Sequence, residues 1–306
     1  MLGVGARLAL AGLAYFICFA VSFGLLMPAV PPDPTAASSP IPPALAPLVV
    51  AALDTAVMAW LILRSRLRGW ALTATMIAVL FGVQSFMPQV ESWVFQAYSG
   101  MAQHLPAEMI PRILMAGLLH ACLWIPLAVR ILDRWRTESA ADAAAGPRPA
   151  ASAPLWSAKL PLAAAAYVLV YFVFGYYVAW RSPAVRTYYQ GSNGPFWMQM
   201  RSVLRDTPWL PGFQLLRGAA WTALGVMVLR STDGSLTERA LAVGILFAVV
   251  MSAGLLMPNP YMPYDVRMAH LLETATSNFL FGWLVVLILR RPSTDYADSL
   301  KKLSAM

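Results

Sequence analysis

Charge is scarce in this chain. Asp, Glu, Lys and Arg make up 12% of its 306 residues, whereas hydrophobic residues make up 59%. Soluble globular domains have about 25% charged residues and about 45–50% apolar ones. The composition therefore excludes an ordinary soluble domain and predicts an integral membrane protein.

Cysteine, histidine and catalytic motifs are also scarce. The chain has 2 Cys and 3 His, and neither Cys18 nor Cys122 belongs to a metal-ligand pair or a disulfide framework. No P-loop, dinucleotide fingerprint, nucleophile elbow or HExxH motif occurs. The sequence thus designates no catalytic residue, no metal site and no particular cofactor, and it disfavours an enzyme.

Long apolar runs are what the chain does have. A bilayer-spanning α-helix needs about 20 apolar residues, and eight such runs occur, at residues 8–28, 44–63, 70–88, 113–132, 160–180, 211–229, 240–257 and 269–289. They predict an all-α, polytopic integral membrane protein with eight transmembrane helices. The lipid bilayer is accordingly its first expected partner.

The Lys and Arg residues are distributed unequally between alternate connections. Fifteen lie toward one side of the predicted bundle and seven toward the other. The positive-inside rule then predicts a bacterial-type inner (plasma) membrane protein with both termini in the cytoplasm. Because the basic excess is explained by topology, it calls for no nucleic-acid partner.

Short matches in the same order indicate an internal duplication. LALAGLAY (8–15) resembles LPLAAAAY (160–167), and MAGLLH (115–120) resembles MAHLLE (268–273). We predict two parallel four-helix repeats, residues 1–136 and 159–292, because four spans per half leave both halves pointing the same way. A flexible cytoplasmic linker (137–158) joins them, and a cytoplasmic tail (293–306) follows.

Three outer connections have distinct patterns. The proline-rich segment 28–47 should be extended and exposed. Residues 195–210 carry apolar groups on one helical face and predict a helix lying in the membrane interface. Residues 90–105 are a second candidate for such a helix.

Three ionisable side chains should lie deep in the bundle: Asp54, His120 and Arg217. A helical rise of about 1.5 Å per residue puts Asp54 and His120 about 15 Å from the cytoplasmic end and Arg217 about 20 Å. A carboxyl group at that depth must be protonated or partnered. Asp54 is therefore either a proton-coupling or cation-binding group or the partner of Arg217. His120 could relay protons, although a hydrogen bond to a neighbouring helix is the commoner role.

A second group should line the outer entrance. Glu273 lies near the outer boundary, and His270 shares its helical face. With Glu91, Asp265 and Arg267 these residues predict an outer polar cluster. The spacing His-x-x-Glu is weak evidence for a metal, so a hydrogen-bonded network that closes the bundle is the favoured interpretation.

Three functions remain open from the sequence. The first is a transporter, or a membrane protein that binds a small molecule or lipid, with a polar site between the repeats and proton coupling as one option. The second is a membrane enzyme acting on a lipid-linked substrate at the outer leaflet. In that case Arg181, Arg186, Arg201 and Arg205 would hold an anionic head group. The third is an accessory subunit with partners in a larger membrane complex.

Overall fold

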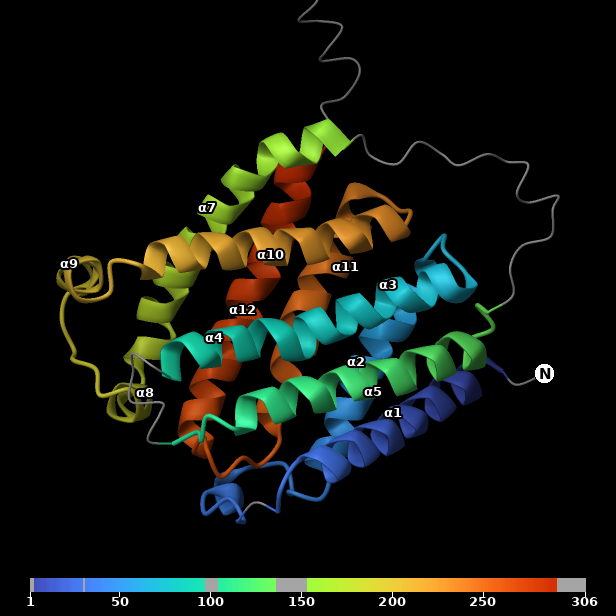
Figure 1. Ribbon diagram of the computed structural model, residues 1–306, viewed down its shortest axis with the longest axis horizontal. Coiled ribbons are helices and arrows are strands. Elements are labelled where there is room, and N and C mark those ends of the chain that lie inside the picture. Colours follow the sequence, from blue (N-terminus) through green and yellow to red (C-terminus); the bar gives the residue numbers. More distant parts are fainter. Residues whose placement is uncertain (1–2, 30, 97–103, 136–152, 291–306) are drawn as a thin grey trace, which may run out of the picture.

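The computed structural model describes residues 3–29, 31–96, 104–135 and 153–290 (Figure 1). Within these residues the chain is helical and contains no strand. Two residues, Ser65 and Thr232, form an isolated antiparallel β-bridge.

The helices divide between a first half, residues 3–135, and a second half, residues 153–290. The first half contains α1 (Val4–Leu26), α2 (Ala46–Arg64), α3 (Gly69–Phe81), α4 (Met87–Gln96) and α5 (Met109–Ile131). The second half contains α7 (Ala153–Tyr177), α8 (Pro183–Tyr188), α9 (Phe196–Asp206), α10 (Leu210–Ser231), α11 (Leu236–Ile245) and α12 (Tyr264–Leu289).

One π-helical segment interrupts the third long helix of each half. The segment η2 (Gly82–Phe86) joins α3 to α4, and η5 (Leu246–Val250) continues α11. Short 3₁₀ turns are η1 (Ala36–Ser38), η4 (Ala179–Arg181) and η6 (Ala253–Leu256).

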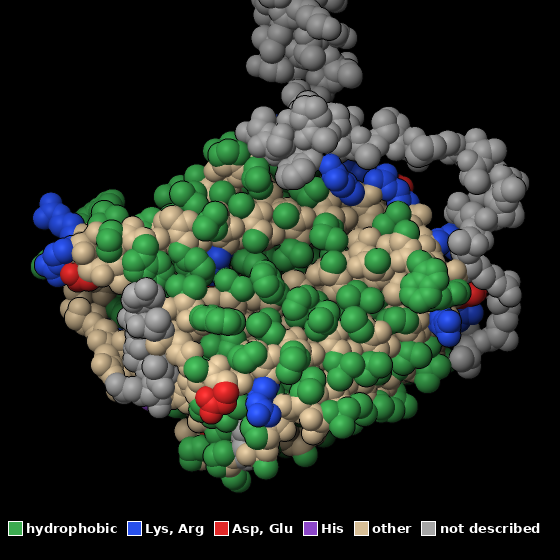
Figure 2. Space-filling view, viewed as in Figure 1, with side chains coloured by type: hydrophobic (Ala, Val, Ile, Leu, Met, Phe, Trp, Pro, Cys, Tyr) green, Lys and Arg blue, Asp and Glu red, His purple; other side chains and the backbone are tan. Residues whose placement is uncertain are grey.

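Among the described residues, eight helices, four in each half, are long and apolar enough to cross a membrane. They coincide with the eight apolar runs, so the predicted all-helical class and helix number are confirmed. Large apolar side chains also point outward, with Leu216 73% exposed and Leu169 68% exposed. Figure 2 shows one such face, largely hydrophobic, with Lys and Arg gathered toward its ends. These features indicate a multi-pass membrane protein.

The two halves use the same packing pattern. In the first, α1 packs on α2 and α5, and α3 packs on α2 and α5; Figure 1 shows α1 beside α5. In the second, α7 packs on α10 and α12, and α11 packs on α10 and α12. Between the halves, α2 packs on α11 with η5, α10 packs on α3 with η2, and η2 contacts η5.

Three predictions about the segments between the spans are wrong. Residues 90–96 are not a separate interfacial helix, because α4 continues the third span to Gln96. The linker ends earlier than expected, since α7 begins at Ala153; residues 137–152 and the tail lie outside the described residues. The proline-rich segment is not simply extended, because it contains η1 and its Asp33 is 8% exposed. Residues 196–206 do form a helix, α9.

Candidate functional site

Asp54 lies on α2 and is fully buried. Its Oδ2 accepts a hydrogen bond from the Tyr15 hydroxyl at 2.6 Å and one from Gln84 Nε2 at 2.6 Å. Its Oδ1 has no hydrogen-bond partner among the described residues. Gln84 Nε2 also donates to the Tyr15 oxygen at 2.6 Å, so the three side chains form a closed triangle. All donors to this carboxyl group are therefore neutral.

Gln84 lies in the π-helical segment η2, which follows α3 and places this side chain within hydrogen-bond distance of Asp54. A π-turn inserts one extra residue per turn and re-aims the side chains on that turn. Close packing holds the segment on both sides. A Cβ on Gly82 would lie 2.6 Å from Leu224 of α10, and one on Gly117 of α5 would lie 2.0 Å from the Ser85 hydroxyl. Gly117 therefore lets η2 lie this near α5, whereas a Cβ at Gly82 would require the Leu224 side chain to shift.

His120 belongs to the same cluster. Its ring is fully buried on α5 and lies edge-on to Tyr15, with 4.4 Å between ring centroids. Neither ring nitrogen has a hydrogen-bond partner in the described part of the chain, and the same holds for Thr55 Oγ1. The expected hydrogen bond from His120 to a neighbouring helix is therefore wrong. We call Tyr15, Asp54, Gln84 and His120 the Asp54 site.

Arg217 does not join this site, and its predicted pairing with Asp54 is wrong. Its guanidinium forms a bidentate ion pair with Glu91 of α4, with both N–O distances 2.8 Å. Arg217 Nη1 also donates to Gln214 Oε1 at 2.9 Å. The Arg217 side chain is 3% exposed and that of Glu91 is 27% exposed. This pair joins the first half to the second.

Aromatic rings and a second carboxylate surround that ion pair. The Arg217 guanidinium carbon lies 5.7 Å from the Tyr167 ring centre and 5.8 Å from that of Phe213. Tyr167 interacts electrostatically with Arg217, Glu91 and Glu273. Glu273 contacts His270 Nδ1 at 3.7 Å. Glu91, Arg217 and Glu273 with Tyr167 and Gln214 are called the Arg217 site.

Tyr189, which follows α8, borders the Arg217 site. Burial, and then the nearby Tyr188, Glu91 and Glu273, raise the pKa of Tyr189 above its ordinary value. Its ring lies edge-on to His270, with the centroids 5.7 Å apart. The structure thus brings Glu91, Glu273 and His270 of the predicted outer cluster together and adds Arg217 to them.

The remaining two members of the predicted outer cluster lie elsewhere. Arg267 pairs with Asp33 at 3.0 Å, with both side chains 1% exposed, and also donates to the Met257 carbonyl. Asp265 is exposed in the first turn of α12 and forms no ion pair with a described residue. The burial of Asp33 in the proline-rich segment was not predicted. The sequence Asp-x-Thr in this segment, typical of a turn in which the carboxylate accepts from the residue two positions on, was the available signal.

Asp33 is held by several donors. Thr35 donates to Oδ1 from its backbone at 2.8 Å and from its hydroxyl at 2.7 Å, and the Asn259 backbone donates to Oδ2 at 3.1 Å. Burial by itself raises the pKa of Asp33, but these hydrogen bonds and the charge of Arg267 outweigh it and lower that pKa. Asp33 is therefore a charged partner for Arg267.

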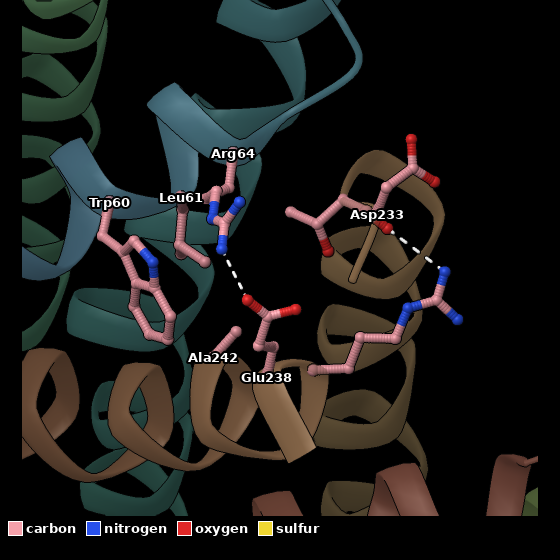
Figure 3. A pocket seen from close by; sticks show the side chains of 8 residues that line it. Trp60, Leu61, Arg64, Asp233, Glu238 and Ala242 are labelled. Carbon is pink, nitrogen blue, oxygen red and sulfur yellow. Dashed lines mark hydrogen bonds and ion pairs between the residues drawn. The ribbon is translucent and has the colours of Figure 1, made fainter. Parts of the chain in front are cut away.

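The opposite end of the interface is also joined by polar contacts. The β-bridge residues Ser65 and Thr232 directly follow α2 and α10, and Arg66 N donates to the Ser231 carbonyl at 2.8 Å. Figure 3 shows Arg64 and Glu238 pointing toward each other across a shallow pocket at this end, where they form an ion pair. Both side chains of this ion pair are well exposed, 57% and 43%, so solvent screens the pair and this pocket is not the candidate ligand site.

Metal chemistry has no evident ligand set here. Within the described residues, no group of three or more His, Cys, Asp and Glu side chains is placed to hold a metal ion. Comparison of the chain with family models, curated proteins and solved structures found no match. The function must therefore be argued from the two sites themselves.

Proposed function

We propose that the protein is a proton-coupled transporter of a bacterial-type inner membrane, built from two parallel four-helix repeats, with both termini in the cytoplasm. Asp54 carries the proton. The observation on which this rests is a fully buried carboxyl group that has only neutral donors and whose Oδ1 lacks a partner among the described residues. An isolated charge in hydrocarbon is very costly, so this group is stable in its protonated form.

The packing supports the repeat. In each half the first and third helices both pack on the second and fourth, and across the interface the second helix of each half packs on the third helix of the other. The β-bridge joins residues that end the equivalent helices α2 and α10. An antiparallel contact between equivalent residues is what an approximate two-fold axis along the membrane normal produces. Parallel repeats in transporters are related by such an axis.

Ion pairs join the two halves at both ends of the interface, where they could close either end as one half rocks against the other. Of the seven ion pairs found between described residues, four join one half to the other. They are Arg64–Glu238 and Arg66–Asp233 at the end marked by the β-bridge, and Glu91–Arg217 and Asp33–Arg267 at the other. Transporters of this architecture rock one repeat against the other around a central site. The structure then corresponds to a state closed at both ends.

Infrared titration of the purified, reconstituted protein tests the role of Asp54. We expect a protonated carboxyl C=O band near neutral pH that disappears in Asp54→Asn. Asparagine has the size of a neutral Asp and keeps an acceptor for Tyr15 and Gln84, so the fold should survive. Proton uptake driven by a pH gradient should fall to the level of empty liposomes.

Asp133→Asn is the matched control, because Asp133 lies outside the eight spans, and its side chain is 55% exposed and pairs with Arg7. This variant should keep both the band and the proton uptake. An Asp54 that is ionised at neutral pH, or proton uptake that persists in Asp54→Asn, contradicts the proposal.

A further inference from the structure

The Arg217 site has the chemistry of a carboxylate receptor. A guanidinium presents a planar fork of donors that matches a carboxylate in a bidentate arrangement, and Glu91 occupies that fork in the structure. The two partners are not equally fixed. Arg217 is almost fully buried on α10, whereas the more exposed Glu91 lies in the middle of α4.

We infer that Arg217 binds the carboxylate of a small monoanionic solute with an apolar body, and that Glu91 is an internal competitor for the same guanidinium. This inference rests on the proposed transporter function and names its substrate class. Gln214 provides a second observation. Its side chain is fully buried, its Oε1 accepts from Arg217, and its Nε2 has no partner among the described residues. That free N–H group can donate to a ligand oxygen beside the guanidinium.

The surroundings of Arg217 define the rest of the ligand. The rings of Tyr167 and Phe213 flank the guanidinium and offer apolar surface to an aromatic or aliphatic body. Glu273 lies within electrostatic range of the same Tyr167 ring. A carboxylate near this ring disfavours a second negative charge on the ligand. Monoanions are therefore preferred over dianions.

Charge balance connects this ligand to Asp54. A monocarboxylate that displaces Glu91 takes over its ion pair, and the partly exposed Glu91 side chain can turn outward. One proton on Asp54 and one carboxylate on Arg217 sum to zero charge. Their joint movement across the membrane would be electrically neutral.

Calorimetric titration of the full-length protein in detergent with benzoate tests the inference. Wild type should bind benzoate, and Arg217→Gln should lose binding. Glu91→Gln should bind roughly tenfold more tightly, because it removes the competitor's charge; tenfold corresponds to about 1.4 kcal/mol. Succinate, a dianion, should bind much more weakly than benzoate. Arg205→Gln, which changes an exposed arginine on α9, should bind as wild type does.

The direction of the affinity change in Glu91→Gln distinguishes a damaged fold from the loss of a competitor. A variant that only damages the fold loses affinity, whereas loss of a competitor raises it. Oleate serves as a second probe, since a carboxylate can also arrive from the bilayer; tighter Arg217-dependent binding of oleate than of benzoate assigns a fatty acid as the ligand. Absence of benzoate and oleate binding in Glu91→Gln, or binding that persists in Arg217→Gln, overturns the inference. The infrared result on Asp54 is independent of either outcome, so failure of one proposal is distinguishable from failure of the other.

Discussion

At the scale of single residues, the protein accommodates buried ionisable groups in two ways. Arg267 keeps its charge because Asp33 and backbone carbonyls surround it, whereas Asp54 has only neutral donors. The first arrangement suits a permanent contact and the second suits a group that gains and loses a proton. Truncating one member of a buried pair leaves the other charge uncompensated, at a cost of about 3–5 kcal/mol.

We therefore expect Asp33→Asn to lower the free energy of unfolding by about 3–5 kcal/mol, because Arg267 is left charged and buried. The pKa of folded Asp33 is lowered, so its contribution is complete above the pKa of an unfolded aspartate, about 3.9, and is lost as pH falls through the folded value. Thermal unfolding of the detergent-solubilised protein across this acidic range measures both effects. Wild type should lose stability there, and Asp33→Asn should lack that part of the loss.

The exposed pair Arg205–Asp206 supplies the matched control. Hydrogen bonds from Arg205 and Ser202 lower the pKa of Asp206 to about 2. The Asp206 side chain is 52% exposed, so solvent screens the pair. Asp206→Asn should leave stability nearly unchanged. Equal effects of Asp33→Asn and Asp206→Asn would refute the distinction between buried and exposed pairs.

The burial of Asp54, His120 and Arg217 within the bundle was predictable from the sequence, but their partners were not. Helical rise locates Asp54, His120 and Arg217 along their helices, yet it does not say which direction each side chain faces. The assignment of Arg217 to Asp54 failed because the third span continues to Gln96 and carries Glu91 to Arg217. Tyr15 and Gln84 were missed because a tyrosine and a glutamine in an apolar run are common and carry no charge.

At the scale of helices, the segment η2 connects the Asp54 site with the interface. Its Gln84 donates to Asp54, its Gly82 packs against Leu224 of the second half, and the segment contacts η5. Apolar periodicity predicted the span but not the extra residue, since a single π-turn barely changes the hydrophobic pattern. π-turns often mark functional sites. Under the proposed function, this turn would link a protonation change at Asp54 to the packing between the halves.

Gln84→Leu should remove the donor to Asp54 and Tyr15 while keeping a side chain of similar size. Because a hydrogen bond to the carboxyl group weakens its C=O bond, we expect the Asp54 infrared band to move to higher frequency. Proton uptake should fall in parallel. Infrared difference spectra of the reconstituted variant measure the shift.

Gln89→Leu makes the same substitution five residues further along the continuous α3–η2–α4 helix. Gln89 forms no hydrogen bond through its Oε1 with any described residue, so the Asp54 band should stay where it is in wild type. A purely structural role for Gln84 predicts lower stability with an unshifted band. That result would exclude Gln84 as the group that tunes Asp54.

At the scale of the whole molecule, the two halves share a framework but not a chemistry. Asp54 lies eleven residues before Ser65, and the residue eleven positions before Thr232 is Trp221. The first half therefore carries the buried carboxyl group where the second carries an indole. The sequence matches predicted the duplication, which stays a prediction. The difference at this position appears only when the β-bridge is used to align the halves, and under the proposed function Asp54 is the proton-carrying residue of the pair.

Opening of the interface at the end marked by the β-bridge is the movement that would connect Asp54 with the cytoplasm. Residues in an antiparallel bridge have Cα atoms about 4.5–5.5 Å apart, within the range that a disulfide can span. In a background lacking Cys18 and Cys122, Ser65→Cys combined with Thr232→Cys should therefore cross-link on oxidation.

The cross-link should slow deuterium exchange of the Asp54 carboxyl proton, measured by the shift of its infrared band in deuterated buffer. Reduction should restore the original rate, and each single-cysteine variant should exchange like the background. Exchange that is equally fast in the oxidised and reduced double variant would show that Asp54 reaches solvent by another route, and would remove relative movement of the two halves at this end from the mechanism.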